Sequence, residues 1–420
     1  MTEPSLYDQI LDYSNRANPW PLYDKLRSQP VWEEADGTFV VSTFREVNAL
    51  QHDPRLSSDT ANLLPEYADK APPPEAPGGL PASFIHTDPP QHDTLRRIAM
   101  RQFGPPHRPD HIDKLTPTLA AIVGGLVDNL ADKQEADIVD DVAYPFPVAV
   151  ICQLLGVPPE DQPRFSAWVD PIVASLGKPT PEQMQARVDA MQHMSQYMSE
   201  LAQRRRAEPG DDMISGYITD DGPDGRLQGG DLVATLTLLL IAGHETTVNL
   251  ITNGWLTLLR HPQVLARLRS EPDLGIRLVE ELLRYEPPVH ILPNRTTLAD
   301  IHIADTTIPA ASPLVLVLAA GNRDPGRFPD PDRFDPDRTD NAHLGFGGGI
   351  HYCFGAPLAR TEAQVALPEL VRRLVNPRLV ADPPPYRPNP ELGGPRHLLV
   401  DFDTVAPAEQ ARAASPAVPT

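Results

Sequence analysis

The chain has 420 residues, two cysteines and a formal net charge of −21 at pH 7. So acidic a protein is not expected to bind nucleic acid, because phosphate contacts need a basic surface. So few cysteines exclude a disulfide framework and indicate a reducing compartment. The length suffices for one large fold, which we place at residues 1–404, and the Ala- and Pro-rich residues 405–420 are expected to form a disordered tail.

The N-terminal segment has neither a basic stretch nor an apolar one, so we expect no signal peptide, no membrane anchor and a cytoplasmic location. Further along, Val31–Glu33 and Thr38–Val41 flank Asp36-Gly37, a pattern that predicts a β-hairpin. Residues 71–82 are dominated by proline, glycine and alanine and predict a loop.

A basic stretch runs from Thr94 to Pro109 and contains four arginines and no acid. In a helix, Arg97 and Arg101 would share one face. A solvated basic face without a partner accounts for this pattern about as well as a docking surface does.

Residues 112–285 are predicted to be mostly helical, with breaks at proline and glycine clusters. Within them, Cys152 lies in the apolar run Val148–Leu155, which is typical of a core helix, and a free cysteine there is expected to act as a small hydrophobe.

A long helix is predicted from Asp231, as the N-cap, to about Leu259, before the stop signal His261-Pro262. About thirty residues at 1.5 Å per residue would span roughly 45 Å. We expect this helix to be too polar to cross a membrane.

The middle of that helix carries Ala242-Gly243-His244-Glu245-Thr246-Thr247. A zinc protease would need a second histidine four residues after His244, where Val248 stands. Glycine and threonine weaken the hydrogen-bond ladder, because a threonine hydroxyl can bond to a carbonyl one turn back, so we expect a bent turn.

Beyond this helix, Glu281 and Arg284 lie three residues apart and can pair on one helix face, although such a pair alone is typical of a solvated surface. Ile301–Ile303 and Leu314–Leu318 then predict strands. The predicted fold class is therefore mainly α with a smaller β region.

Cys353 stands near the end of Phe346-Gly347-Gly348-Gly349-Ile350-His351-Tyr352-Cys353-Phe354-Gly355. The glycines allow a tight turn whose N–H groups can hold a thiolate, which is a good ligand for a redox metal. A dinucleotide-binding loop is excluded because the last required glycine is missing, and a structural zinc site because only His351 lies near.

This segment resembles the heme-ligand signature of the cytochrome P-450 superfamily of heme-thiolate monooxygenases, Phe-x-x-Gly-x-His-x-Cys-x-Gly. The sequence around Glu281 and Arg284, and the later Asn322–Phe334, resembles the family's Glu-x-x-Arg helix and the meander behind the heme. The resemblance covers nearly the whole chain and implies the fold of the soluble bacterial type.

The resemblance implies that Cys353 ligates the iron of heme b, that Thr246 hydrogen-bonds bound dioxygen and that Glu245 helps to bring in protons. It also implies that Glu281 and Arg284, with a later arginine that we take as Arg333, lock the cysteine loop. The buried heme propionates need cations. The candidates at matching positions are His92, Arg96, Arg295 and His351.

Ferredoxin and its reductase are the implied electron donors, because no flavin, nicotinamide or iron–sulfur motif follows the heme region. We expect Arg97, Arg101 and Arg360 to dock the acidic ferredoxin. In the family, the region of residues 71–82 folds over the substrate. Asp305 and Ala311 occupy turns where the family often has glycine, and because alanine tolerates positive φ poorly, we expect the second turn to differ in shape.

The implied reaction is insertion of one oxygen atom of O2 into a hydrophobic small molecule, by hydroxylation or epoxidation. A peroxide-using or oxidatively coupling relative, and a non-enzymatic heme sensor, are the alternatives. The expected pocket residues are largely apolar: Phe84, Ile85, Leu240, Ala242, Val289 and Ile291.

Overall fold

A computed structural model describes residues 3–70, 82–104, 108, 110–175, 179–271 and 273–408. The predicted loop at 71–82 lies outside these residues except for Ala82, and so does most of the predicted tail. Helices make up 55% of the structure and strands 11%, which confirms the mainly α fold class with a smaller β region.

The α-helices are α1 Leu6–Leu11, α2 Trp20–Leu26, α3 Phe44–Gln51, α4 Gln91–Phe103, α5 His111–Asp128, α6 Pro145–Leu155, α7 Gln162–Ala174, α8 Pro181–Ala207, α9 Met213–Thr219, α10 Gly229–Arg260, α11 Pro262–Ser270, α12 Leu274–Tyr285, α13 Leu318–Asn322 and α14 Ala356–Arg373. The strands are β1 Val31–Glu33, β2 Phe39–Val41, β3 Leu56–Ser57, β4 Glu135–Asp137, β5 Leu292–Thr297, β6 Ile301–Ile303, β7 Thr306–Ile308, β8 Pro313–Leu316, β9 Leu374–Val375, β10 Arg378–Leu379, β11 Leu399–Asp401 and β12 Thr404–Val405.

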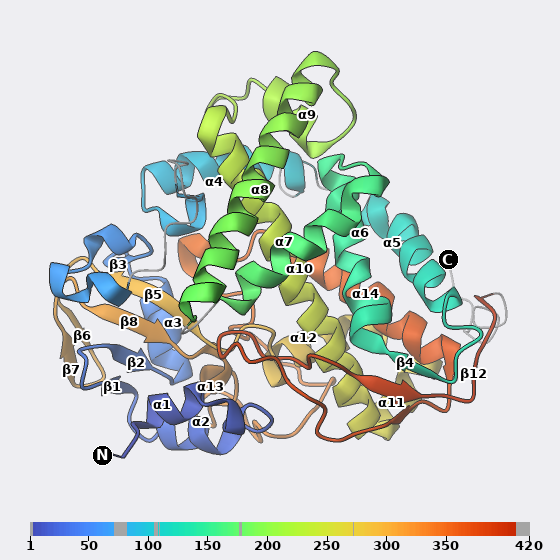
Figure 1. Cartoon of the computed structure of the whole chain (residues 1–420). Coiled ribbons are helices and arrows are strands. Elements are labelled where there is room, and N and C mark those ends of the chain that lie inside the picture. The colour runs from blue at the N-terminus through green and yellow to red at the C-terminus, as the bar shows by residue number, and fades with distance from the viewer. Residues whose placement is uncertain are drawn as a thin grey trace.

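Helix α10 runs through the middle of the molecule and packs against α6, α8, α12 and α14 (Figure 1). Its apolar side chains belong to the main core cluster, which joins most of the helices. Residues in the middle of α10 are thereby held deep inside the protein, where a reaction can be shielded from water.

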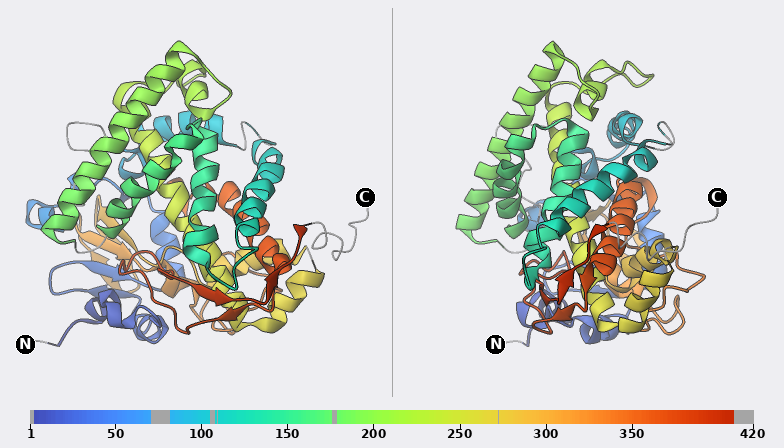
Figure 2. Two further views of the ribbon diagram at one scale, coloured as in Figure 1. Left: turned by 45° about the vertical axis from the view of Figure 1, so that its right-hand side comes forward. Right: turned by 90° about the vertical axis from the view of Figure 1, so that its right-hand side faces the viewer.

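The largest sheet has the strand order β1-β2-β8-β5-β3 and lies with the N-terminal helices at one side of the helical part, as the two further views also show (Figure 2). The predicted hairpin is confirmed, because Val31 pairs with Val41 and Glu33 with Phe39. The predicted strand 301–303 is confirmed as β6, and the predicted strand 314–318 is β8, which stops at Leu316 because Leu318 begins α13.

Three local expectations need correction. The N-cap of α10 is Gln228, and Asp231 lies in the first turn instead, where its carboxylate favours the helix dipole. Val405, placed at the start of a disordered tail, pairs with Leu374 in β12, so the ordered chain extends beyond residue 404. Ala311 adopts φ +59 and Asp305 φ +62, so both turns have the glycine-like conformation, and the expected change of shape at Ala311 is wrong.

Helix α10 is also more apolar than expected. Among the described helices it alone is long and apolar enough to cross a membrane by length and composition, with a mean hydropathy of 1.2 over its most apolar stretch. The expectation that it is too polar is therefore wrong on composition. Because 72% of that stretch is buried inside the protein, its apolar character is that of a central core helix.

Candidate active site

A cavity of about 770 Å³ lies between the cysteine loop, α10 and the segment that leads into β5. Its lining includes Cys353 on one element and Thr246 on another, and its other walls are largely apolar. The fold thus brings together two residues that are 107 positions apart in the sequence, as the resemblance implied.

The glycines of the cysteine loop are required by its shape. Gly347 and Gly349 have φ values of +67 and +62, and a Cβ on Gly349 would lie 1.9 Å from the carbonyl oxygen of Gln51 in α3. The loop closes with a hydrogen bond of 2.9 Å from the backbone N–H of Cys353 to the carbonyl of Phe346. Glycine therefore lets the loop approach α3 closely and fixes the place of the thiol.

Cys353 ends this loop just before the N-terminus of α14. Burial raises the pKa of its thiol, while backbone N–H groups and the charges of Arg96 and Arg360 oppose that effect. A metal cation at the sulfur would remove the proton outright. Cys152, by contrast, is fully buried in α6, where burial raises its pKa to about 12, as expected of an inert core cysteine.

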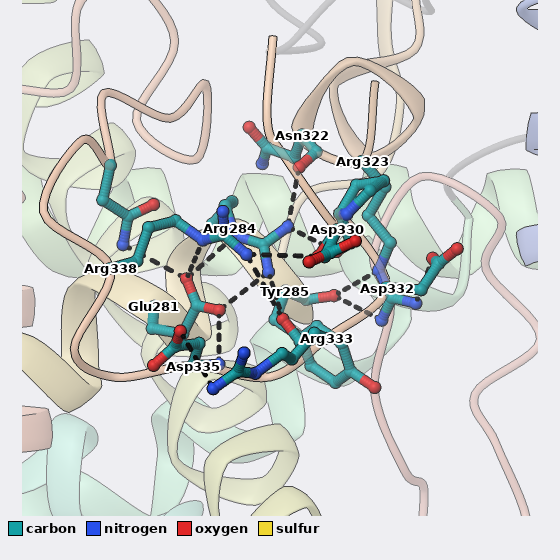
Figure 3. Close-up of polar contacts among 12 residues, drawn as sticks. Glu281, Arg284, Tyr285, Asn322, Arg323, Asp330, Asp332, Arg333, Asp335 and Arg338 are labelled. Carbon is teal, nitrogen blue, oxygen red and sulfur yellow. Dashed lines mark hydrogen bonds and ion pairs between the residues drawn. The ribbon is translucent and has the colours of Figure 1, made fainter. Parts of the chain in front are cut away.

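Behind the loop, Glu281 and Arg284 form an ion pair with no exposed surface, through contacts of 2.8 and 2.7 Å (Figure 3). Arg284 also donates to the carbonyls of Asn322, Pro331 and Arg333. The predicted pairing is confirmed, but a solvated surface pair is excluded, because both side chains are buried and hydrogen-bonded on every side.

The later arginine of this network is not Arg333. The side chain of Arg333 is 68% exposed, and only its backbone carbonyl contacts Arg284. Arg338 takes that place, with Nε 3.6 Å from Oε2 of Glu281 and a side chain only 10% exposed (Figure 3). Sequence order alone did not separate the two arginines, because the meander turns between them.

Two further contacts connect α12 to the cysteine loop. Asn322 accepts a hydrogen bond of 2.7 Å from the N–H of Leu344 at the start of the loop and donates one of 3.2 Å to the carbonyl of Leu283. Glu280 pairs with Arg360 of α14 at 2.6 Å and with His343 at 3.2 Å. These side chains hold both ends of the loop against one helix.

On α10, Thr246 lines the cavity, and its hydroxyl donates to the carbonyl of Ala242 at 2.9 Å. Glu245 does not line it. Its carboxylate is 3% exposed and pairs with Arg387 of the C-terminal segment at 2.6 Å. Burial raises the pKa of Glu245, and the charge of Arg387 opposes that shift.

Sequence reasoning missed Glu362, on α14. It is buried, lines the cavity and accepts a hydrogen bond of 3.4 Å from the hydroxyl of Thr247. Burial raises the pKa of Glu362 to about 8, so that it holds its proton at neutral pH. The sequence did offer one indication of this role, because Glu362 stands nine residues after Cys353 on the face of α14 that points inward.

The four predicted cations gather near one another. The rings of His92 and His351 lie 4.4 Å apart, and Arg295 and Arg96 are both close enough to lower the pKa of His351, which burial chiefly brings to about 3. His92 Nε2 and His351 Nδ1 are buried and have no hydrogen-bond partner among the described residues. Arg295 contacts only the carbonyls of Pro293 and Asn294 at hydrogen-bond distance within the described residues.

This arrangement fits a large planar group with an anionic edge, such as heme. An apolar cavity would surround the ring, the thiol would meet a central metal, and the two arginines with the incompletely satisfied histidines would meet the carboxylates. The orphaned ring nitrogens of His92 and His351 have a use only when an acceptor or donor occupies that end of the cavity.

The three arginines expected at a docking surface are already paired. Arg97 bonds Asp224 at 2.8 Å and Arg101 bonds Asp220 at 3.2 Å, both acids lying between α9 and α10, while Arg360 bonds Glu280. The side chain of Arg101 is only 10% exposed, that of Arg360 is 28% exposed, and that of Arg97 is 55% exposed, so Arg97 is the most accessible of the three and Arg101 the least.

The predicted pocket residues are partly wrong. Ala242 and Val289 line the cavity, whereas Leu240 and Ile291 are buried in the core, and Leu239 and Leu292 face the cavity in their place. On α10, the lining positions 239, 242, 243, 246, 247 and 250 follow the i, i+3, i+4 spacing of one helix face. The prediction missed that face by one residue.

Phe84 and Ile85 do not line the cavity either. Phe84 packs instead against Phe354 and His92, with ring centroids 5.9 and 6.4 Å apart. Its ring supports the cysteine loop from the side of α4 and belongs to the main core.

The family model of cytochrome P-450 matches residues 77–389. The chain is 39% identical over 396 residues to the cytochrome P-450 monooxygenase PikC of Streptomyces venezuelae, with 91% of each chain covered. It is 36% identical to the cyclomarin C epoxidase CymV of Salinispora arenicola, covering 93% of this chain and 97% of that protein. The solved structure of cytochrome P-450 CYP109Q5 from Chondromyces apiculatus aligns with a TM-score of 0.84 and 34% identity, over 95% of this chain and 98% of that one.

Proposed function

The chain belongs to the cytochrome P-450 family of heme-dependent monooxygenases, and from that membership we propose that it oxygenates an apolar small molecule with Cys353 as the iron ligand. One observation carries this proposal. Cys353 and Thr246, which are 107 positions apart in the sequence, line the same largely apolar cavity, and the unsatisfied histidine nitrogens of His92 and His351 lie beside it.

When bound, the heme supplies the redox chemistry that activates dioxygen. The sulfur of Cys353 would hold its iron, while the side chains of His92, Arg96, Arg295 and His351 would hold its propionates. His351 is oriented for this role by a hydrogen bond of 2.9 Å between its Nε2 and the hydroxyl of Ser58, which leaves Nδ1 for the ligand.

We infer that protons reach the reacting oxygen by way of α10 and α14. The hydroxyl of Thr246 donates its hydrogen bond to the carbonyl of Ala242, so its oxygen is free to accept one. Glu245 can deliver a proton only after its pair with Arg387 opens. Glu362 already lines the cavity in its protonated form and contacts Thr247, so it is the nearer proton reserve.

The apolar lining favours a hydrophobic substrate such as a terpenoid, fatty acid, steroid or polyketide. Two of the relatives are a vitamin D(3) 25-hydroxylase and a 6-deoxyerythronolide B hydroxylase. Both names describe hydroxylation, which we propose for this chain as well, with epoxidation as the second outcome because CymV is an epoxidase.

We propose ferredoxin and its reductase as the electron donors. Near Cys353, the side chains of Ile350 and Tyr352 are 46% and 40% exposed, and Arg97 on α4 adds an exposed cation. An Arg97→Glu variant should raise the half-saturating ferredoxin concentration, whereas the matched change Arg378→Glu, at an exposed pair with Asp403, should not. Equal half-saturation in both variants would exclude Arg97 from docking.

The iron ligand is tested by the absorbance difference spectrum of the reduced protein with and without carbon monoxide. We expect a strongly red-shifted Soret band that Cys353→Ala abolishes. A band typical of histidine-ligated heme in the unsubstituted protein would overturn the assignment of Cys353. Substrate candidates would then be screened by the spin-state shift, and product formation measured with reconstituted redox partners.

A further inference from the structure

A second cavity, of about 370 Å³, lies where five parts of the chain meet: residues 16–20, the C-terminal part of α10, the end of α12 with the segment after it, Arg323 after α13, and residues 382–394. Among the described residues, none that lines it also lines the cavity beside Cys353. Its walls carry arginine, histidine and acidic side chains, so it differs chemically from the apolar first cavity.

One arginine at this cavity differs from the other two. Arg260 pairs with Asp382, and Arg323 pairs with Glu286 at 2.8 Å and with Asp332 at 3.3 Å. Arg16 is the third arginine, is 4% exposed and forms no ion pair with a described residue. Asp12 acts on the charge of Arg16 only from beyond ion-pair distance.

The guanidinium of Arg16 also has unused hydrogen-bond donors. Its Nη2 donates to the carbonyl of Leu11 at 3.2 Å, while Nε is buried and has no partner in the part of the chain that the structure describes. An unpaired buried guanidinium is costly, and its planar fork of donors matches a carboxylate or a phosphate group.

His290 adds a second donor. Its Nδ1 lies 3.0 Å from the hydroxyl of Tyr23, and its Nε2 is buried with no partner among the residues that the structure describes. Burial, together with Arg16 and Arg323, lowers the pKa of His290 to about 3, so the ring is neutral. The buried hydroxyl of Tyr23 is satisfied when it donates to Nδ1, and that tautomer leaves an N–H at Nε2.

The main chain passes close to this nitrogen. A Cβ on Gly393 would lie 2.1 Å from His290 Nε2, so a residue with a side chain would displace the imidazole. Asn253 of α10 donates to the carbonyl of Gly393 at 2.8 Å and keeps the segment in place. The unused donors of Arg16 and His290 thus belong to a built polar cavity and are not exposed at a surface.

We propose that this cavity binds a compact oxyanion, a phosphate or a carboxylate group, through the guanidinium of Arg16 and the Nε2–H of His290. The occupant would pair with the guanidinium of Arg16 and use both free donors. It would also tie the N-terminal segment to the segment after α12, so binding would stabilise the folded protein. The proposal is independent of the oxygenation chemistry.

The test uses heme-loaded protein purified without phosphate or carboxylate buffers, at constant ionic strength set by potassium chloride. Inorganic phosphate and succinate are titrated separately by calorimetry, and unfolding temperature is followed in parallel. We expect saturable binding of at least one probe with a dissociation constant at or below about 1 mM, and a rise in unfolding temperature. Binding of only one probe would identify phosphate or carboxylate as the group that is recognised.

Two variants locate the site. Arg16→Gln should weaken binding at least about tenfold, and Arg16→Lys less, because lysine keeps the charge but not the fork. Arg378→Gln, which removes an exposed arginine elsewhere, should bind as the unsubstituted protein does. The carbon monoxide spectrum serves as the check that each variant is folded. Absence of saturable binding to the unsubstituted protein, or equal binding in the folded Arg16→Gln or Arg16→Lys variant, would overturn the proposal.

Discussion

The two sides of the active-site region treat their polar groups in opposite ways. Behind the cysteine loop, every side-chain nitrogen and oxygen of Glu281 and Arg284 is partnered, although neither side chain has exposed surface. Around the cavity itself, His92 Nε2 and His351 Nδ1 are buried and unpartnered. A satisfied network stabilises the fold, whereas spare hydrogen-bonding capacity is expected where a ligand binds.

The largest effect should come from the one residue that belongs to both regions. Cys353→Ala should lower oxygenation by at least about 10³-fold, because no other described thiol lines the cavity. Turnover with reconstituted redox partners measures this loss. The control is Cys152→Ala, which removes a fully buried core thiol and should cost stability but leave the carbon monoxide spectrum unchanged. Normal turnover in Cys353→Ala would contradict the assigned ligand.

The satisfied network is broken by Arg284→Met, which leaves Glu281 buried and unpaired. We expect a loss of about 3–5 kcal/mol in the free energy of unfolding, measured by denaturant titration. Arg333→Met, at a side chain that is 68% exposed, should change it by less than about 0.5 kcal/mol. A larger loss of stability in Arg333→Met than in Arg338→Met would show that the assignment of Arg338 to the network is mistaken.

How far the sequence predicted these two regions follows from the kind of information each needs. Glu281, Arg284 and Cys353 stand in short patterns with fixed spacing, so their partners or surroundings were predictable. Arg338 was missed because its approach to Glu281 depends on the path of an irregular meander. Glu362 was missed because only the packing of α14 against α10 turns it into the cavity.

The same limit explains the errors of register and charge. Leu240 was chosen in place of Leu239 because an apolar run does not show which helix face is covered. Arg97 pairs with Asp224 and Arg101 with Asp220, and each pair joins residues more than 100 positions apart. The basic stretch itself contains no acid, so the sequence did not show that these arginines are paired. Local patterns predicted the elements, and long-range contacts decided what their side chains do.

On the cavity side, Thr246→Ala should lower the share of consumed NADPH that ends as product, with an expected effect of about 10²-fold on product formation. Thr252→Ala is the matched control. Its hydroxyl makes the same bond one turn back on α10, to Val248 at 2.9 Å, but it does not line the cavity. Equal loss of product in both variants would mean that Thr246 acts by shaping the helix and not through its hydroxyl.

The contribution of the paired carboxylate Glu280 to the stability of the protein should depend on pH. Burial would raise its pKa, but His343 and Arg360 lower it to about 2 from the ordinary 4.5. Its contribution to stability is therefore present above about pH 4.5 and is lost as the pH falls toward 2. Glu280→Gln should be less stable than the unsubstituted protein by about 2 kcal/mol at pH 7, and the gap should shrink below pH 4.5. A gap independent of pH would mean that packing, and not charge, holds this contact.

The smallest effect lies outside both regions and sets the scale for a purely backbone contribution. Ala311 is held at φ +59, a conformation that costs a residue with a Cβ about 1–2 kcal/mol. Ala311→Gly removes that cost but adds the entropy of a freer unfolded chain, about 0.5–1 kcal/mol, so a net gain of about 0.5–1 kcal/mol is expected. The neighbouring Ala310→Gly, at a residue without positive φ, should lose stability by the entropy alone. Denaturant unfolding of Ala311→Gly and Ala310→Gly measures the change in the free energy of unfolding of each variant. A loss of stability in both would mean that the turn does not strain Ala311.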